Sequence, residues 1–185
     1  MTRRDATENR ERVLDAAIAV FAEQGTGAST EVIAERAGVG AGTVFRHFPT
    51  KQTLLEAVFE RMLGKLGDYV RSRGEERDAG AALFDVIQYL AMNSSTKRAV
   101  AETLAGGGMD LRKRAWGGGL REALTAVLTR AQTEGAVRDD IGVDEMMGFI
   151  AATSRAAEVS TGAVRERPIA ALLDGLRPRP RPRKR

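Results

Sequence analysis

The 185-residue sequence has no cysteine and a single histidine, so disulfides and thiolate metal sites are excluded. A general base needs a partner within reach and a metal ion needs several ligands. His47 has no second histidine to act with, and the carboxylates are scattered as on a solvated surface. No P-loop or Ser-His-Asp pattern is present. We therefore expect no enzyme activity, no catalytic residues, no metal site and no cofactor.

Long apolar runs are also missing. No stretch of about 18 apolar residues occurs, so the sequence predicts no membrane-spanning helix and no membrane partner. The polar start of the chain lacks the apolar stretch of a signal peptide. Together with the absence of cysteine, this favours a cytoplasmic protein.

Proline is scarce: three of the five prolines lie in the last eight residues, which leaves the middle of the chain free to be helical. Alternating, strand-like runs are rare, so the sequence predicts an all-α protein. We expect helices over residues 7–24, 31–37 and 40–47, followed by one that starts after Thr50. Further helices are expected over 78–94, 96–105, 110–135, 142–162 and 166–176.

The first 50 residues contain strong local signals. Leu14, Ala17, Ile18 and Phe21 form one apolar stripe, and Gly25 is placed to end that helix in the left-handed conformation. Thr30 is predicted to cap the second helix, with Ile33 and Ala34 facing inward, and Thr50 to cap the fourth. Val44 and Phe48 lie four residues apart on one face of the third helix, which Pro49 ends. This order of elements is typical of a helix-turn-helix.

Charge is distributed unevenly. The net charge is +4, yet residues 1–51 carry seven Lys/Arg and seven Asp/Glu. The last nine residues carry six Lys/Arg and no acidic residue. Evidence for nucleic-acid binding in the first part of the chain must therefore come from how charges sort onto helix faces. The tail either raises non-specific DNA affinity through counterion release or is simply a solvated end.

Residues 12–55 resemble the DNA-binding region of the TetR family. The resemblance is carried by the stretches 13–17, 29–39 and 42–51, together with Phe21, Gly25 and Leu54-Leu55. It implies an N-terminal helix-turn-helix domain over 7–52 and a helical-bundle domain for ligand binding and dimerisation over 53–176. Residues 177–185 are expected to form a disordered basic tail, because they have nothing to bury.

The family pattern also implies which residues meet DNA. Ala41, Gly42 and Phe45 would approach base edges, and Thr30, Thr43, Arg46, His47 and Lys51 would approach phosphates. The family usually has tyrosine at position 45, serine at 40 and a longer polar residue at 41, where this chain has Phe45, Gly40 and Ala41. We therefore predict that specificity depends on methyl contacts, Arg46 and DNA shape. An arm with Arg3 and Arg4 is expected to reach the backbone or minor groove.

The function implied by the resemblance is sequence-specific regulation of transcription, with repression as the family's usual mode. The partners would be a palindromic double-stranded operator, a second copy of the chain and a small-molecule effector that releases the DNA. The ligand pocket is predicted at Phe84, Ile87, Gln88, Met92, Met109 and Trp116. The interface of the homodimer is predicted at Phe149, Ile150, Thr153, Ala157, Leu172 and Leu173.

Three alternatives remain open at this point. The first is a DNA-binding protein that needs no ligand because its core is filled. The second is a helical interaction scaffold that has lost specific DNA binding. The neutral net charge of residues 1–51 would allow this, as would the small number of side chains on the third helix that could hydrogen-bond to bases. The third is an enzyme or transport module on a helical fold, against which the scarcity of His and Cys counts.

Overall fold

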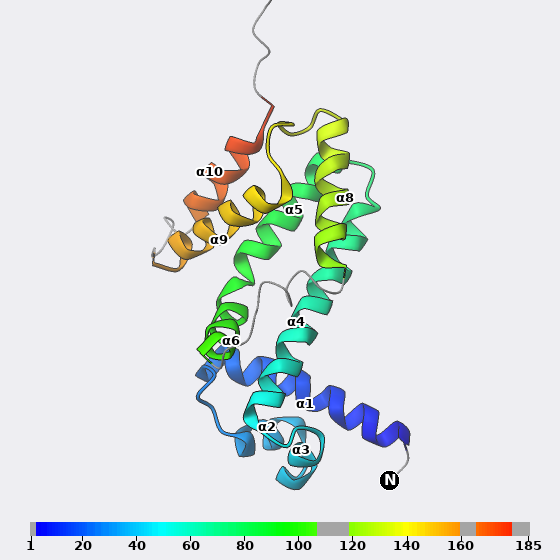
Figure 1. Ribbon diagram of the computed structural model, residues 1–185, viewed down its shortest axis with the longest axis vertical. Helices are drawn as coiled ribbons and strands as arrows, with labels where there is room; N and C mark the ends of the chain where they lie inside the picture. Colours follow the sequence, from blue (N-terminus) through cyan, green and yellow to red (C-terminus); the bar gives the residue numbers. More distant parts are fainter. Residues whose placement is uncertain (1–2, 107–118, 160–165, 179–185) are drawn as a thin grey trace, which may run out of the picture. The chain divides into compact units, whose positions relative to one another are not determined.

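The computed structural model describes residues 3–106, 119–159 and 166–178, and within these ranges all regular structure is helical (Figure 1). The all-α fold class is therefore confirmed. The helices are α1 (Arg3–Gln24), α2 (Thr30–Ala37), α3 (Ala41–His47), α4 (Lys51–Gly74), α5 (Ala79–Met92), α6 (Ser94–Gly106), α8 (Leu120–Thr133), α9 (Val143–Val159) and α10 (Arg167–Leu176). No helix in the described ranges combines the length and apolar character needed to cross a membrane.

The helices form two compact units. The first unit contains α1, α2, α3, α6 and the first part of α4. The second unit contains the rest of α4 with α5, α8, α9 and α10. The chain passes from the first unit to the second between Gly64 and Lys65, within α4, and returns to the first between Ser94 and Ser95. A domain boundary at residue 52 remains a prediction.

The apolar stripe of α1 builds the core of the first unit. Leu14, Ala17 and Phe21 of the predicted stripe are at most 2% exposed, whereas Ile18 is only half-buried. Val13 and Val20 complete this buried face. Gly25 has φ +77° and donates its N–H to the carbonyl of Phe21, at 3.1 Å, which confirms the predicted end of the helix.

The start of α1 differs from the prediction. The helix begins at Arg3, whereas the sequence predicts a start near Thr7. Arg4 lies within the first turns, and its Nε donates to Glu8 Oε1 at 2.9 Å. The segment that was expected to form a DNA-contacting arm is therefore helical from Arg3 onward, and the ion pair of Arg4 with Glu8 supports the helix as i,i+4 pairs of opposite charge do.

Helix α5 is the centre of the second unit. Its residues Leu83, Val86, Ile87 and Leu90 are at most 1% exposed, and the helix is in contact with α8, α9 and α10. A helix that is apolar around most of its circumference must be covered on several sides. The neighbouring helices supply that cover.

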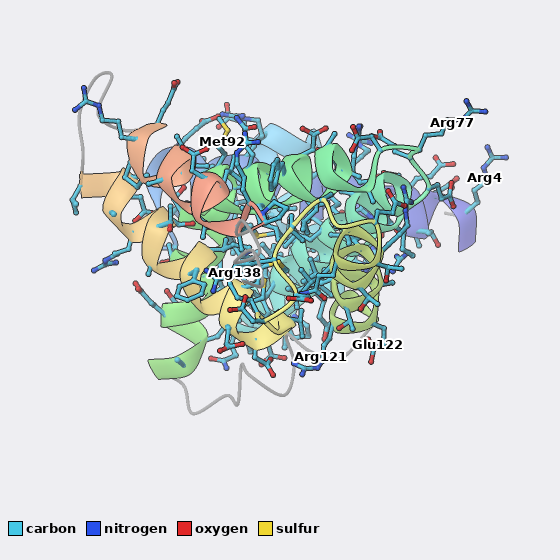
Figure 2. The ribbon with its side chains drawn as sticks, turned by 90° about the horizontal axis from the view of Figure 1, so that it is seen from above. Arg4, Arg77, Met92, Arg121, Glu122 and Arg138 are labelled. Atoms are coloured by element: carbon cyan, nitrogen blue, oxygen red, sulfur yellow. The ribbon has the colours of Figure 1, made fainter. Side chains whose placement is uncertain are left out.

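The last helix is anchored by its C-terminal end. The backbone N–H of Arg138, in the turn between α8 and α9 (Figure 2), donates to the carbonyl of Leu176 at 2.9 Å. Leu176 and Val137 are 1% and 3% exposed. Gly135 begins this turn with φ +70°, as expected for a break between two long helices. This hydrogen bond joins the C-terminal end of α10 to the turn between α8 and α9.

A close approach of backbones at Gly80 leads to a prediction. A Cβ atom at this position would lie 2.8 Å from Ala136 Cβ. Gly80→Val should therefore lower the free energy of unfolding by about 2 kcal/mol, because overpacking displaces neighbouring backbone. Urea denaturation measures the change. Ala81→Val, at an exposed position of the same helix, is the matched control, and equal effects of the two substitutions would contradict the tight contact.

Candidate nucleic-acid interface

Ser29, and not Thr30, caps helix α2. Ser29 has extended backbone, and its hydroxyl accepts from the Val32 N–H at 3.4 Å. The predicted cap Thr30 is instead the first helical residue, half-buried, with its hydroxyl 3.5 Å from Glu31 Oε2. Both residues carry a hydroxyl suited to capping, and the position where the backbone turns helical selects Ser29.

A carboxylate already occupies the start of α2. Hydrogen bonds hold the pKa of the Glu31 carboxyl below its ordinary value, first from its own backbone N–H and then from the Ser29 hydroxyl. An acidic side chain in the first turn of a helix is stabilised by the helix dipole. Thr30, which was predicted to approach a phosphate, therefore lies beside a carboxylate in the first turn of α2.

A tight turn joins α2 to α3. Gly38 has φ +64°, and its N–H points at the carbonyls of Ala34 and Glu35, while the Val39 N–H donates to the Ala34 carbonyl at 3.0 Å. This left-handed cap closes the end of α2. Gly40 then precedes the next helix as its N-cap, with its carbonyl accepting from the Thr43 N–H at 2.8 Å.

Helix α3 has one buried face and one open face. Val44 is 1% exposed and Phe48, directly after the helix, is 4% exposed, as predicted for the core. On the opposite side Gly42 and Arg46 are exposed, and the Phe45 ring is 46% exposed. Within the described ranges Arg46 has no hydrogen-bond or ion-pair partner. The outward face of α3 thus presents an aromatic ring and an unpaired cation beside a stretch with little side-chain bulk.

His47 ends α3 and is half-buried. Its Nε2 is buried and has no hydrogen-bond partner among the described residues. The imidazole lies 6.3 Å from the Phe48 ring, measured between ring centroids, and the Arg10 guanidinium lies 5.4 Å from that same phenyl ring.

Lys51 connects α4 to the loop before α2. Its Nζ donates to the carbonyl of Ala28 at 2.8 Å. Thr50 caps α4 as predicted: its hydroxyl accepts from the Thr53 N–H at 3.1 Å, and the Thr53 hydroxyl accepts from the Thr50 N–H at 3.2 Å. This reciprocal capping holds the first turn of α4 in place. An ammonium with three donors keeps capacity for a phosphate beside the Ala28 carbonyl.

The predicted ligand-pocket residues lie in different surroundings. Ile87 is fully buried in the core of the second unit. Phe84 is half-buried, and the Arg177 guanidinium lies 5.7 Å from the centre of its ring. Its ring is therefore in contact with the residue that follows α10.

Gln88 and Met92 are exposed on α5, with Met92 66% exposed (Figure 2). The side-chain amide of Gln88 is therefore not buried in the core of the second unit. Asn93, which ends α5, donates its side-chain amide to the Tyr89 carbonyl at 2.9 Å. Met109 and Trp116 lie outside the described residues.

The residues predicted for the dimer interface separate into two groups. Ile150 and Ala157 are only 3% and 8% exposed, because their own chain covers them. They therefore have little area left for a second copy. Phe149 is 48% exposed, and Thr153, Leu172 and Leu173 are half-buried. Helices α9 and α10, which carry all six residues, pack against each other.

Models of two family domains match this chain. Residues 13–58 match the model described as bacterial regulatory proteins of the tetR family, and residues 78–178 match the C-terminal domain described as transcriptional regulator SbtR-like. The transcriptional regulator SrpR of Pseudomonas putida is 34% identical over 111 residues. This match covers 59% of the present chain and 51% of SrpR, so the chain spans about half the length of that relative.

Solved structures agree with these matches. A TetR transcription regulatory protein from Mycobacterium vanbaalenii is 36% identical, with a TM-score of 0.75 over 95% of this chain and 98% of that one. The regulator SCO0520 from Streptomyces coelicolor is 31% identical, with a TM-score of 0.72 over 91% of this chain and 98% of its own. Since one family model alone spans more than half of the sequence, the chain belongs to the TetR family and is a DNA-binding transcriptional regulator with an N-terminal helix-turn-helix.

Proposed function

We propose that the chain represses transcription by binding a roughly palindromic operator as a homodimer, and that a small-molecule effector bound to the second unit releases the DNA. The observation that carries this proposal is the open face of α3. Val44 and Phe48 hold the helix on the core, while Gly42, Phe45 and Arg46 remain free to meet a partner. A helix anchored on one side and open on the other is what major-groove reading requires.

The dimensions and chemistry of α3 suit a groove. The major groove is about 12 Å wide and admits a single helix. Ala41 and Gly42 let the backbone approach closely, and among the described residues, the backbone of α3 itself apart, nothing lies within 4 Å of the place that a Cβ at Gly42 would take. The Phe45 ring offers an apolar contact for a thymine methyl, and Arg46 offers donors for a base edge or phosphate. Specificity therefore rests on few hydrogen bonds from side chains to bases.

Dimerisation is supported by exposed apolar side chains on α9. Phe149 and Val159 are 48% and 79% exposed, and the alanines at 151, 152 and 156 are exposed between them. Together with Leu172 and Leu173 of α10, they form a face that two copies can bury as a four-helix arrangement. A twofold axis between copies repeats the reading helix, which is the reason for expecting a palindromic operator.

Phe149→Glu should convert the dimer to a monomer. Both copies lose an aromatic anchor and gain a charge, so dimer dissociation should become at least about 100-fold more favourable. Sedimentation over a range of concentrations measures this change. Thr129→Glu places the same charge at an exposed position of α8 and serves as control. A Phe149→Glu protein that stays dimeric would move the interface away from this face.

Effector release requires a ligand that prefers one conformation. A small molecule with equal affinity for the DNA-binding and released states would shift nothing, however tightly it bound. The proposed effector site must therefore differ between the two states. The candidates for its lining remain the predicted pocket residues, which are Phe84, Ile87, Gln88, Met92, Met109 and Trp116. A ligand screen against the operator complex tests this part of the proposal.

The first experiment is selection from random duplex DNA at physiological salt, followed by sequencing of the retained fraction. A palindromic consensus that disappears in Thr43→Ala and Arg46→Ala variants supports the dimeric reading head. Retention without a consensus would contradict it, because non-specific binding needs only phosphate charge. Removal of residues 179–185 in a parallel selection separates the contribution of the basic tail.

A further inference from the structure

Arg12, on α1, reaches the end of α2. Its Nη2 donates to the carbonyl of Ala37 at 2.5 Å and to that of Gly38 at 3.0 Å, and its Nη1 donates to Asn9 Oδ1 at 3.3 Å. One guanidinium therefore holds two consecutive carbonyls of the turn that leads into α3. These contacts join residues that are 25 and 26 positions apart in the chain.

The chemistry of the turn explains why an arginine suits this place. The last carbonyls of a helix have no partner within the helix and carry its partial negative charge. A guanidinium supplies several N–H donors and a permanent positive charge, so its hydrogen bonds to these carbonyls are charge-assisted. Arg12 thus stabilises the C-terminal end of α2 from a neighbouring helix.

Gly38 and Arg12 are also matched in shape. A Cβ atom at Gly38 would lie 2.8 Å from Arg12 Nη2, closer than atoms of these types approach each other. The positive φ of Gly38, +64°, already favours glycine. The guanidinium therefore occupies the space directly over the turn, and the turn has no side chain that would displace it.

We propose that Arg12 is a positioning residue for the reading helix. Only Val39 and Gly40 separate the Gly38 turn from the first residue of α3, so the turn sets the direction in which α3 leaves α2. By holding the Ala37 and Gly38 carbonyls, Arg12 fixes that direction without contacting DNA. This inference rests on the proposed function, because it concerns the helix that would read the operator.

Arg12→Gln is the direct test, with Arg36→Gln as matched control. Arg36→Gln removes the same charge from the same unit. Arg36 also links α2 to α1, through Glu23 Oε2 at 2.5 Å, but it does not contact the carbonyls of Ala37 and Gly38. Loss of hydrogen bonds from a charged group should lower the ratio of specific to non-specific affinity by about tenfold in Arg12→Gln. Arg36→Gln should leave that ratio close to wild type.

Two further readouts separate positioning from other roles. If Arg12 bound a phosphate itself, its loss would lower the slope of log affinity against log salt by about two in a dimer. A positioning role leaves this slope unchanged. A general loss of folded protein would reduce specific and non-specific binding together, so the ratio would not move. Arg12→Lys keeps the charge and should recover only part of the ratio, because an ammonium lacks the fork of donors.

Each outcome bears on one statement only. A wild-type protein that selects no consensus sequence would contradict the proposed function itself. If Arg12→Gln binds the consensus as well as Arg36→Gln does, the positioning role alone is overturned. A fall in the salt slope of Arg12→Gln would also overturn this role, because it indicates a phosphate contact. If Arg12→Gln does not fold, Arg12→Lys takes its place: a reduced ratio supports the role, and a wild-type ratio overturns it.

Discussion

Arg46→Glu should weaken binding to the selected operator by at least about 100-fold, because each half-site loses a charge-assisted contact and gains a repulsive charge. Arg46 is exposed on the open face of α3 and has no partner among the described residues, so it is free to meet DNA. The same change should reduce the salt slope by about two, one for each copy of the dimer, if Arg46 binds phosphate. Fluorescence anisotropy at several salt concentrations measures both quantities.

The control for this prediction is Arg77→Glu. Arg77 is an exposed arginine in the turn between α4 and α5 of the second unit, and the substitution changes the net charge by the same amount (Figure 2). It should alter operator affinity only through weak long-range electrostatics. Unchanged affinity in Arg46→Glu would mean that α3 is not the reading helix. A similar loss in both variants would point to non-specific attraction of the whole protein to DNA.

Phe48→Ala should lower the free energy of unfolding by about 3–5 kcal/mol, the usual result of removing a buried phenyl ring. Phe48 is 4% exposed and ends α3 through its N–H, which donates to the Val44 carbonyl at 2.8 Å. The Arg10 guanidinium also lies over the Phe48 ring, 5.4 Å from its centre. Denaturation in urea, followed by circular dichroism, measures the loss, which is a large part of the stability of a typical domain.

Phe45→Ala is the matched comparison, three residues away. Its ring is 46% exposed, so its removal should cost less than about 1 kcal/mol of stability. The Phe45→Ala protein should nevertheless bind the operator more weakly, because an apolar contact with DNA is lost. Phe48→Ala should show the opposite pattern, with lower stability and a normal consensus in the fraction that remains folded. Equal stability losses in the two variants would contradict the conclusion that α3 has one buried face and one open face.

Features that depend on a few neighbouring residues could be predicted from the sequence alone. Gly25 ends α1 in the left-handed conformation, Thr50 caps α4, and Val44 and Phe48 face the core, as the local pattern indicated. Each of these outcomes is decided within one or two turns of helix, by a hydroxyl that accepts an N–H or by a residue without a Cβ. The family resemblance likewise rests on a continuous stretch of motif, which the match over residues 13–58 confirms.

Burial and long-range contact could not be predicted in this way. Ile150 and Ala157 have the composition of an interface, yet their own chain covers them, while Gln88 is exposed on a helix that is otherwise largely buried. The carbonyls that Lys51 and Arg12 hold lie more than 20 residues away in the sequence. Periodicity identifies the apolar side of a helix but not the neighbour that covers it. The sequence by itself therefore determined the helical fold class, some of the helix ends and the family, whereas only the tertiary structure decided which charges are used internally and which, like Arg46, remain available for DNA.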